Sequence, residues 1–395
     1  MERKVIITKW RDKIVTSVLE NDEIVELHCN VNSADGEDSH ALGNIYVGRV
    51  KNIVPNIGAA FIEIAPGVEC YYPMGQNESP IFTHKIGKKP LCIGDELLVQ
   101  ISREASKTKA PTVTSKLEFT GRYAVLSGGN TRIGTSTKLD RETRERLKGI
   151  LLPFQNDAFG LVARTNAKDS TESEIVAEIQ RLIAEYEAIV SISKSRTCFS
   201  CLKQAPKSYI TDVKNIYSDG LQEIKVEDED IFEELKFYLE MEQPQNLEKL
   251  IYYGEKTFPL MKLYNIEGVI EKALKERVWL KNGGYLVIQP TEALTVIDVN
   301  SGKYVAKKHA DESYLKINLE AAKEVAKQIR LRNLSGIIIV DFINLDREED
   351  TKTLLKCMRE YLSHDPIQTT LVDVTKLHLV EITRKKVRKM LYETV

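Results

Sequence analysis

Two apolar runs in the last third of the sequence each lead into a single aspartate. The first, ALTVIDVNSGK, covers residues 293–303 and contains Asp298, and the second, GIIIVDFINLD, covers residues 336–346 and contains Asp341. Between them, residues 317–333 (INLEAAKEVAKQIRLRN) have the apolar spacing of a helix. Because a strand–helix–strand unit places its two strands parallel and often adjacent, the sequence predicts both aspartates at one end of a sheet.

The side chains at this predicted sheet end favour a bound metal ion. Ligands in such sheets bind beyond the carboxyl ends of the strands. Two neighbouring carboxylates there repel each other when both are ionised, and a bound cation removes this repulsion. Oxygen ligands suit Mg²⁺ or Mn²⁺. Asn300 lies two residues beyond Asp298, so in extended backbone its side chain points the same way and can orient a water or a phosphate oxygen.

Neither aspartate alone specifies a function, because a strand that ends in aspartate is common as a helix cap or loop anchor. The pair, with Asn300 and the basic run GKYVAKKH at residues 302–309, favours a metal–phosphate site. This chemistry leaves phosphatase, nuclease and kinase open, although the absence of a GxxxxGK[ST] motif disfavours a P-loop enzyme. The apolar residues 337–340 are expected to be buried on both faces of the sheet and so to fix Asp341.

Length and composition indicate a protein of several domains. A chain of 395 residues is long for one core. No apolar run reaches the roughly 20 residues that span a bilayer, and the N-terminus has no signal-peptide pattern, which predicts a cytoplasmic protein without a membrane partner. The formal net charge of −2 argues weakly against nucleic acid. Net charge hides local clusters, and a local basic patch is what binds phosphate. Each cluster taken alone is nevertheless typical of a solvated surface. The clusters are residues 102–109, 302–309 and 383–389.

The six cysteines are scattered, which predicts free thiols rather than disulfides in a chain without a secretion signal. Cys198 and Cys201, in CFSC, have the spacing of half a structural zinc site, but no second pair completes it. The motif follows a polar stretch rather than a buried strand, which argues against a redox role, so an incidental pair is favoured.

Short strands dominate the first 114 residues. Three strand-like segments within residues 1–30 predict a hairpin meander, and a polar stretch at residues 32–40 predicts a loop. Further short strands between residues 44 and 114 predict a small barrel. Within AAFIEI, Phe61 lies on the face opposite the apolar residues; stacking on a nucleic-acid base and burial under a loop are equally compatible with this position.

Helices and strands alternate through the rest of the sequence. The predicted elements are a helix at 138–151, a strand at 160–165, a helix that begins with a capping box at 171–174, a strand at 221–226 and a helix at 266–278. Asp230 and Glu233 are placed for a capping box of a further helix. From residue 279 the alternation is typical of an α/β domain and ends in a predicted helix over residues 380–391.

Three segments strongly resemble the catalytic domain of the ribonuclease E/G family: residues 282–303, 317–343 and 379–389 (LVEITRKKVRK). The similarity extends over essentially the whole chain. Residues 43–64 (GNIYVGRVKNIVPNIGAAFIEI) are similar to the S1-type OB-fold insert of that family, and GLVART at residues 160–165 is similar to the loop of its 5′-phosphate sensor.

The resemblance implies an α/β multidomain fold in which an RNase-H-like fold is split by an S1-type OB-fold β-barrel and a 5′-sensor region, followed by a DNase-I-like α/β catalytic domain. The implied parts are RNase-H-like segments at residues 1–37 and 214–278, the RNA-binding OB-fold at 38–118, the 5′-sensor region at 119–213 and the catalytic domain at 279–395. The implied activity is Mg²⁺-dependent endoribonuclease cleavage of single-stranded RNA that leaves 5′-phosphate and 3′-hydroxyl ends and favours 5′-monophosphorylated RNA. Its implied substrates are rRNA precursors and mRNA.

The resemblance also implies roles for individual residues. The catalytic residues are Asp298, Asn300 and Asp341, of which the two aspartates bind the metal. The residues that recognise a 5′-monophosphate are Arg164 and Thr165. The forked guanidinium of arginine is suited to a phosphate group, and the threonine hydroxyl can donate a further hydrogen bond to it. The residues with which the OB-fold grips RNA are Phe61, Tyr71 and Lys109, with Tyr71 at a position where another aromatic residue is usual.

The sequence departs from the family pattern at two points. The family's C-terminal CPxC motif, through which two subunits share zinc, is absent, which argues against structural zinc and a zinc-linked dimer while leaving a homo-oligomer open. His378 stands where the family usually has glycine, so the local backbone is expected to differ. The missing scaffold tail favours a compact ribonuclease-G-like protein. The alternative is an RNA-binding or assembly protein with little catalysis, against which the complete set of three catalytic residues argues.

Overall fold

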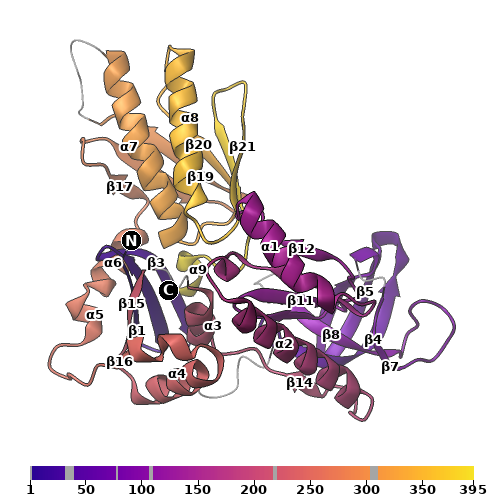
Figure 1. Ribbon diagram of the computed structural model, residues 1–395. Coiled ribbons are helices and arrows are strands. Elements are labelled where there is room, and N and C mark those ends of the chain that lie inside the picture. The colour runs from indigo at the N-terminus through magenta and orange to yellow at the C-terminus, as the bar shows by residue number, and fades with distance from the viewer. Residues whose placement is uncertain (1, 32–39, 77–78, 106–109, 217–219, 303–309) are drawn as a thin grey trace. The chain divides into compact units, whose positions relative to one another are not determined.

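The computed structural model describes residues 2–31, 40–76, 79–105, 110–216, 220–302 and 310–395 (Figure 1). The chain forms two compact units. The first unit consists of Met1–Asn32, Ser208–Val213 and Tyr217–Val395, and the second of Ser33–Lys207 and Lys214–Ile216. Within the described ranges, every helix is too short or too polar to cross a membrane.

One sheet of the first unit is built from two distant parts of the sequence. Its strands are β1 (Arg3–Trp10), β2 (Lys13–Glu20), β3 (Glu23–Val31), β15 (Leu221–Val226) and β16 (Leu250–Tyr252). β1 to β3 form the antiparallel meander predicted for the N-terminus, while β15 pairs in parallel with both β1 and β16. The strand order is therefore β16-β15-β1-β2-β3.

The helices that accompany this sheet include α3 (Ser208–Asn215), α4 (Glu229–Glu242), α5 (Leu260–Leu263) and α6 (Ile266–Ala273). The prediction of a capping box at Asp230 and Glu233 is wrong. The N-cap of α4 is Asp228, which has extended backbone and whose side chain accepts a hydrogen bond from the Ile231 amide at 3.1 Å. Asp230 lies within the first turn, where a carboxylate favours the helix dipole without capping the helix.

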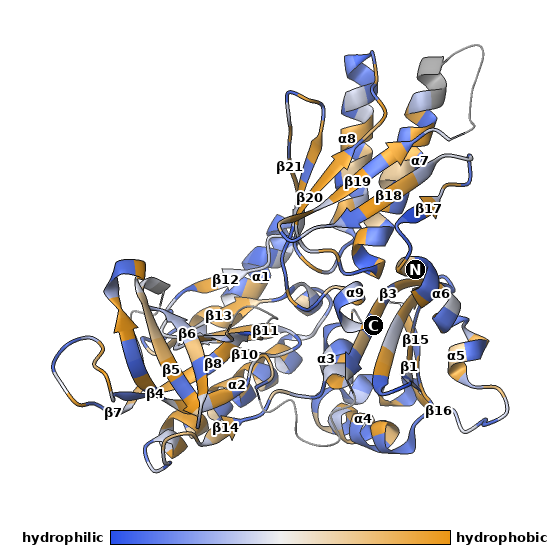
Figure 2. Cartoon of the chain, turned by 180° about the vertical axis from the view of Figure 1, so that it is seen from behind, coloured by the Kyte–Doolittle hydropathy of each residue, from blue (hydrophilic) through white to orange (hydrophobic). Residues whose placement is uncertain are grey.

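The second sheet of the first unit has the order β17-β18-β19-β20-β22-β21. Figure 2 labels these strands except β22. Its strands are β17 (Arg277–Trp279), β18 (Tyr285–Pro290), β19 (Leu294–Asn300), β20 (Gly336–Asp341), β21 (Thr369–Val374) and β22 (Val380–Arg384). β19 and β20 are parallel, as the strand–helix–strand pattern predicts, and the other neighbours are antiparallel. Helices α7 (Ala310–Leu331) and α8 (Glu348–Ser363) supply apolar side chains to the core on one face of this sheet.

The expectation that residues 337–340 are buried on both faces is wrong. Ile338 and Val340 are fully buried beneath the helices, whereas Ile337 is 48% exposed. α7 and α8 share one core with the alternate residues of the strands, so the other face of the sheet has no helical layer within the described part of the first unit. We call this other face the open face.

The prediction of a helix over residues 380–391 is also wrong. The segment forms β22, an irregular stretch and the short helix α9 (Leu391–Thr394). Val380, Ile382 and Arg384 are buried alternately, which is the period of a strand. β22 lies between β20 and β21 and hydrogen bonds to both, and this pairing outweighs the helical spacing of its charged residues.

The second unit contains the predicted barrel. Its strands are β4 (Ile45–Val54), β5 (Ala59–Ala65), β6 (Val68–Pro73), β8 (Glu96–Arg103) and β9 (Thr112–Thr114). They pair in the ring β4-β5-β6-β9-β8, which closes because β8 pairs with β4. The short strands β7 (Phe82–His84) and β14 (Cys201–Lys203) attach to β8 and β4.

A smaller sheet completes the second unit. Its strands, in the order β10-β11-β13-β12, are β10 (Glu118–Thr120), β11 (Ala124–Gly128), β13 (Phe159–Ala163) and β12 (Ile133–Thr135). Helices α1 (Arg141–Leu151) and α2 (Glu172–Ser193) pack against it through a shared apolar core. The capping box predicted for α2 is confirmed, because the Thr171 and Glu174 side chains each bind the backbone of the other residue.

Candidate active site

Asp298 and Asp341 lie directly opposite each other in the second sheet of the first unit. They are register partners in the parallel pair β19–β20, at the carboxyl ends of both strands. Neighbouring strands are about 4.8 Å apart, so the two side chains project from the same face at that spacing. Both residues are exposed, on the open face. The predicted juxtaposition of the two aspartates is therefore present.

Asn300 joins the pair through a hydrogen bond. Its Nδ2 donates to Asp298 Oδ2 at 2.7 Å, and it lies two residues further along β19 on the same face. Within the described ranges, neither Asp298 nor Asp341 forms an ion pair with lysine or arginine. The site therefore presents two carboxylates whose charge the described side chains do not neutralise, beside an amide that can turn its oxygen or its nitrogen outward.

This donor set fits Mg²⁺ or Mn²⁺. In the described part of the chain, no group of three or more histidine, cysteine or acidic side chains is placed to hold a metal. Mg²⁺ does not require such a cage, because it keeps several waters and is usually bound by one or two carboxylates together with substrate phosphates. Asp298 and Asp341 would be the protein ligands, with Asn300 at the edge of the coordination shell.

A buried asparagine, which sequence reasoning missed, fixes the backbone just beyond Asp341. Asn318 of α7 is fully buried; its Nδ2 donates to the Ile343 carbonyl at 2.7 Å, and its Oδ1 accepts from the Ile343 amide at 3.1 Å. These two bonds anchor the segment that leaves β20 to the helix beneath it. The signal in the sequence is a polar residue on the otherwise apolar face of INLEAAK.

The hairpin between β21 and β22 reaches the same end of the sheet. Val380 pairs with Val340, so the tip, residues 376–378, extends beyond the level of Asp341. His378 has φ +64°, the left-handed conformation that glycine favours. Histidine therefore adopts a glycine-like conformation here, at a cost in free energy.

Arg164 and Thr165 lie side by side in the second unit, where β13 ends. Arg164 donates to the Gly121 carbonyl at 2.6 Å and to Asn215 Oδ1 at 2.8 Å. Thr165 Oγ1 is 3.0 Å from Ser136 Oγ. The guanidinium is thus held in one orientation by the protein, and some of its donors serve the fold.

The loop at residues 121–124, whose Gly121 carbonyl accepts a hydrogen bond from Arg164, is fixed by a buried glutamate that sequence reasoning missed. Glu178 of α2 accepts hydrogen bonds from three consecutive backbone amides, residues 122–124, at 2.8, 2.7 and 2.9 Å. Gly121 permits this approach, since a Cβ there would lie 2.2 Å from Glu178 Oε1. The sequence signal is an acidic residue on the buried face of α2, between Ile175 and Leu182.

The barrel carries an aromatic pair on its outer surface. Phe61 and Tyr71 are register partners on β5 and β6, and their ring centroids are 6.2 Å apart at 77°. Both are half-buried, while Ile62 and Ile64 on the opposite side are fully buried inside the barrel. Lys109, the third residue that the family resemblance implies for gripping RNA, lies outside the described residues, as do residues 303–309.

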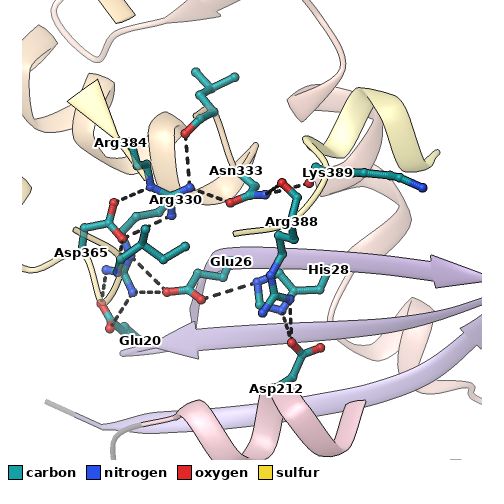
Figure 3. Close-up of polar contacts among 12 residues, drawn as sticks. Glu20, Glu26, His28, Asp212, Arg330, Asn333, Asp365, Arg384, Arg388 and Lys389 are labelled. Atoms are coloured by element: carbon teal, nitrogen blue, oxygen red, sulfur yellow. Dashed lines mark hydrogen bonds and ion pairs between the residues drawn. The ribbon is translucent and has the colours of Figure 1, made fainter. Parts of the chain in front are cut away.

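The basic cluster at residues 383–389 is in part structural (Figure 3). Arg384 is buried and binds Asp365 through two hydrogen bonds, at 2.7 and 3.2 Å. Arg388 binds the buried Asp212 at 2.6 Å, and His28 Nδ1 lies 3.0 Å from the same carboxylate. Burial alone would raise the pKa of Asp212, but His28 and Arg388 outweigh burial and hold that pKa below its ordinary value.

The paired carboxylates and the five-stranded barrel together define a mixed α/β protein with a site suited to a divalent cation. Residues 118–387 match the model of the "Ribonuclease E/G family". The chain is 32% identical to "Ribonuclease E" of Nostoc sp. over 100% of the chain and 57% of that protein, and 30% identical to "Ribonuclease G" of Haemophilus influenzae over 89% of the chain and 73% of that protein. "Ribonuclease G" of Escherichia coli K12 is 31% identical over 88% of the chain and 73% of its own length. The chain belongs to the ribonuclease E/G family, and it spans little more than half the length of the ribonuclease E relative.

Proposed function

We propose that this chain is a Mg²⁺-dependent endoribonuclease that hydrolyses phosphodiester bonds in single-stranded RNA and leaves 5′-phosphate and 3′-hydroxyl ends. The observation that carries the proposal is the register pairing of Asp298 with Asp341, with Asn300 bonded to the first. The names of the relatives, ribonuclease E and ribonuclease G, support RNA as the substrate. Mn²⁺ is the expected substitute for Mg²⁺, and rRNA precursors and mRNA are the proposed RNAs.

The chain's own residues would act by position and charge. Asp298 and Asp341 would hold the metal between adjacent strands and orient it toward the phosphate of the substrate. Asn300, braced by its bond to Asp298, would direct its amide at a phosphate oxygen or at the attacking water. When bound, the metal supplies a more acidic water and neutralises negative charge on the phosphate. Asn318 keeps the strand end fixed, so the carboxylates need no reorganisation during the reaction.

The finer architecture is proposed as the family resemblance implies it. The order β16-β15-β1-β2-β3 supports an RNase-H-like part at residues 1–37 and 214–278, and the closed ring of five strands supports an S1-type OB-fold at 38–118. Residues 119–213 would form the 5′-sensor region. The sheet that carries both aspartates would belong to a DNase-I-like catalytic domain at 279–395.

We further propose that Phe61, Tyr71 and Lys109 grip RNA on the barrel and that Arg164 and Thr165 recognise a 5′-monophosphate. An aromatic pair on a barrel surface is suited to stacking on unpaired bases. Replacing Arg164 with alanine should remove the preference for 5′-monophosphorylated over 5′-hydroxyl RNA, whereas lysine should restore it only partly, since the planar fork is lost. An unchanged preference in the alanine variant would refute this assignment.

The proposed activity is tested with a single-stranded oligoribonucleotide that carries a 5′-monophosphate. The unaltered protein should cut it only with Mg²⁺ or Mn²⁺, and the new ends should be accepted by enzymes that require a 5′-phosphate. Asp298→Asn and Asp341→Asn should still bind the RNA but not cut it. Glu292→Gln is the matched control, because Glu292 is an exposed carboxylate before the opposite end of β19. Equal cleavage by both asparagine variants would contradict the proposal, and RNA binding without any cleavage by the unaltered protein would indicate a binding protein instead.

A further inference from the structure

The open face of the aspartate-bearing sheet carries two aromatic residues beside the site. Trp279 of β17 pairs with Tyr285 of β18, and Tyr285 pairs with Asn300 of β19. Register partners in antiparallel strands project from the same face, so these three side chains form a row across the sheet. The row ends at Asn300, which is bonded to Asp298.

A second row runs parallel to the first and contains the aspartates. Arg277 of β17 pairs with Val287 of β18, Val287 pairs with Asp298, and Asp298 pairs with Asp341. Trp279 is therefore two strands away from the strand of Asp298, about 10 Å at the usual strand spacing. The aromatic row and the candidate metal ligands form one continuous surface on the open face.

Trp279 and Tyr285 contact each other and Arg277, while the ring of Trp279 stays exposed to solvent. The ring centroids of Trp279 and Tyr285 are 5.2 Å apart at 56°. The Arg277 guanidinium lies 4.5 Å from the centroid of Tyr285 and 5.8 Å from that of Trp279. Trp279 is nevertheless 64% exposed. The guanidinium thus packs closer to Tyr285, while the indole remains available to a ligand.

The other tryptophan of the chain provides a comparison. Trp10 is half-buried, and its Nε1 donates to Glu267 Oε1 at 3.2 Å, as is usual for tryptophan within a fold. An arginine lies near each indole, Arg11 at 4.4 Å from the Trp10 ring centroid and Arg277 at 5.8 Å from that of Trp279, so the difference between the two tryptophans is the exposure of Trp279. An exposed indole beside a second aromatic ring offers a flat face on which an unpaired base can stack.

We propose that Trp279, Tyr285 and Arg277 form a stacking subsite for one unpaired base of the RNA, next to the phosphate that is cut. This inference rests on the proposed function. Trp279 would stack on the base, Tyr285 would support the indole, and Arg277 would pair with a neighbouring phosphate, for which its charge is complementary. Because every base has a flat face, the subsite contributes affinity and a preference for unpaired RNA rather than sequence specificity.

Tryptophan fluorescence gives a direct test, because the chain has only two tryptophans. In a Trp10→Phe background, Trp279 is the single reporter. A single-stranded oligoribonucleotide added without divalent metal should quench its emission, whereas a duplex of the same sequence at the same concentration should quench it much less. Unchanged emission at RNA concentrations that saturate binding, followed by the anisotropy of a labelled oligonucleotide, would overturn the subsite.

Substitution and base deletion locate the contact. Trp279→Ala should weaken binding of the single strand by about 5- to 100-fold, while Trp279→Phe should retain most of the affinity. Arg277→Gln should reduce the salt dependence of binding. Removing one base at a time from the oligonucleotide should weaken binding by the unaltered protein at one position next to the cleavage site, and that position should no longer matter in Trp279→Ala.

The outcomes separate this inference from the proposed function. The subsite would be overturned if the unaltered protein and Trp279→Ala bound the single strand with equal affinity and responded equally to the removal of each base. Mg²⁺-dependent cleavage would then still stand. Loss of self-association in Trp279→Ala at unchanged RNA affinity would also overturn it, since the indole would then serve a contact between copies. Absence of Mg²⁺-dependent cleavage by the unaltered protein would refute the proposed function, whatever Trp279 does in the binding measurement.

Discussion

The first unit places its carboxylates in two contrasting environments. Asp298 and Asp341 are exposed, side by side, and free of ion pairs with lysine or arginine in the described part of the chain. Asp212 and Asp365 are buried, and each is bound by an arginine from the C-terminal segment (Figure 3). The partners of a carboxylate, rather than its presence, therefore distinguish a residue that stabilises the fold from one that is available to hold a metal.

The largest expected effect is on the rate of cleavage. Asp341→Asn should lower Mg²⁺-dependent cleavage by roughly a thousandfold or more, since the metal supplies several kcal/mol of transition-state stabilisation. Its free energy of unfolding should stay within about 0.5 kcal/mol of that of the unaltered protein, because the replaced side chain is exposed and forms no ion pair with any residue that the structure describes. Single-turnover cleavage and urea denaturation measure the two quantities. A fall in stability large enough to explain the lost rate would remove the contrast.

Breaking a buried ion pair should lower the free energy of unfolding strongly, in contrast to the replacement of Asp341. Arg384→Ala removes the guanidinium that binds the buried Asp365 and should cost about 3–5 kcal/mol of unfolding free energy. Lys352→Ala is the matched control, because Lys352 and Glu348 form an exposed pair on α8, and the change should be within about 0.5 kcal/mol. Comparable losses in both variants, measured by urea denaturation, would mean that burial does not decide the strength of these pairs.

Acid should reveal the buried carboxylate. The pKa of Asp212 in the folded protein is below its unfolded value of about 3.9, so its stabilising contribution is complete above that pH and is lost as the pH falls toward the folded value. The stability of the unaltered protein should therefore decline below about pH 4 more steeply than that of Asp212→Asn. Parallel curves for the two proteins between pH 5 and pH 2.5 would contradict the assigned ion pairs.

The smallest expected effect is a gain in stability. His378 holds φ +64° at the hairpin tip, a conformation that costs a residue with a Cβ roughly 1 kcal/mol. His378→Gly should therefore raise the free energy of unfolding by about that amount, whereas Lys376→Gly, whose φ is not positive, should not. If both changes lower the stability, the strain assigned to His378 is absent.

Patterning predicted the parts of the fold that depend on local periodicity. The N-terminal meander, the barrel, the capping box of α2 and the parallel pair β19–β20 are present. The pairing of Asp298 with Asp341 followed from the rule that a crossover connection makes neighbouring strands parallel. These features could be predicted because each is specified by residues close together in the sequence or by one connection.

Features that depend on distant partners could not be predicted. Residues 380–391 carry charges at helical spacing, but β22 is made a strand by hydrogen bonds to β20 and β21. The basic cluster at residues 383–389 is typical of a solvated surface when the sequence is considered alone, because the carboxylates that bind Arg384 and Arg388 lie 19 and 176 residues away in the sequence. The aromatic row that ends at Asn300 is likewise visible only once the register of β17, β18 and β19 is known.

The central claim is that Asp298 and Asp341 together hold one divalent cation. Mn²⁺ bound per chain, counted by electron paramagnetic resonance in the absence of RNA, tests it directly in the unaltered protein, in the double variant Asp298→Asn with Asp341→Asn, and in Glu292→Gln. One ion should be lost in the double variant and retained in Glu292→Gln. The claim is contradicted if the double variant binds Mn²⁺ as the unaltered protein does.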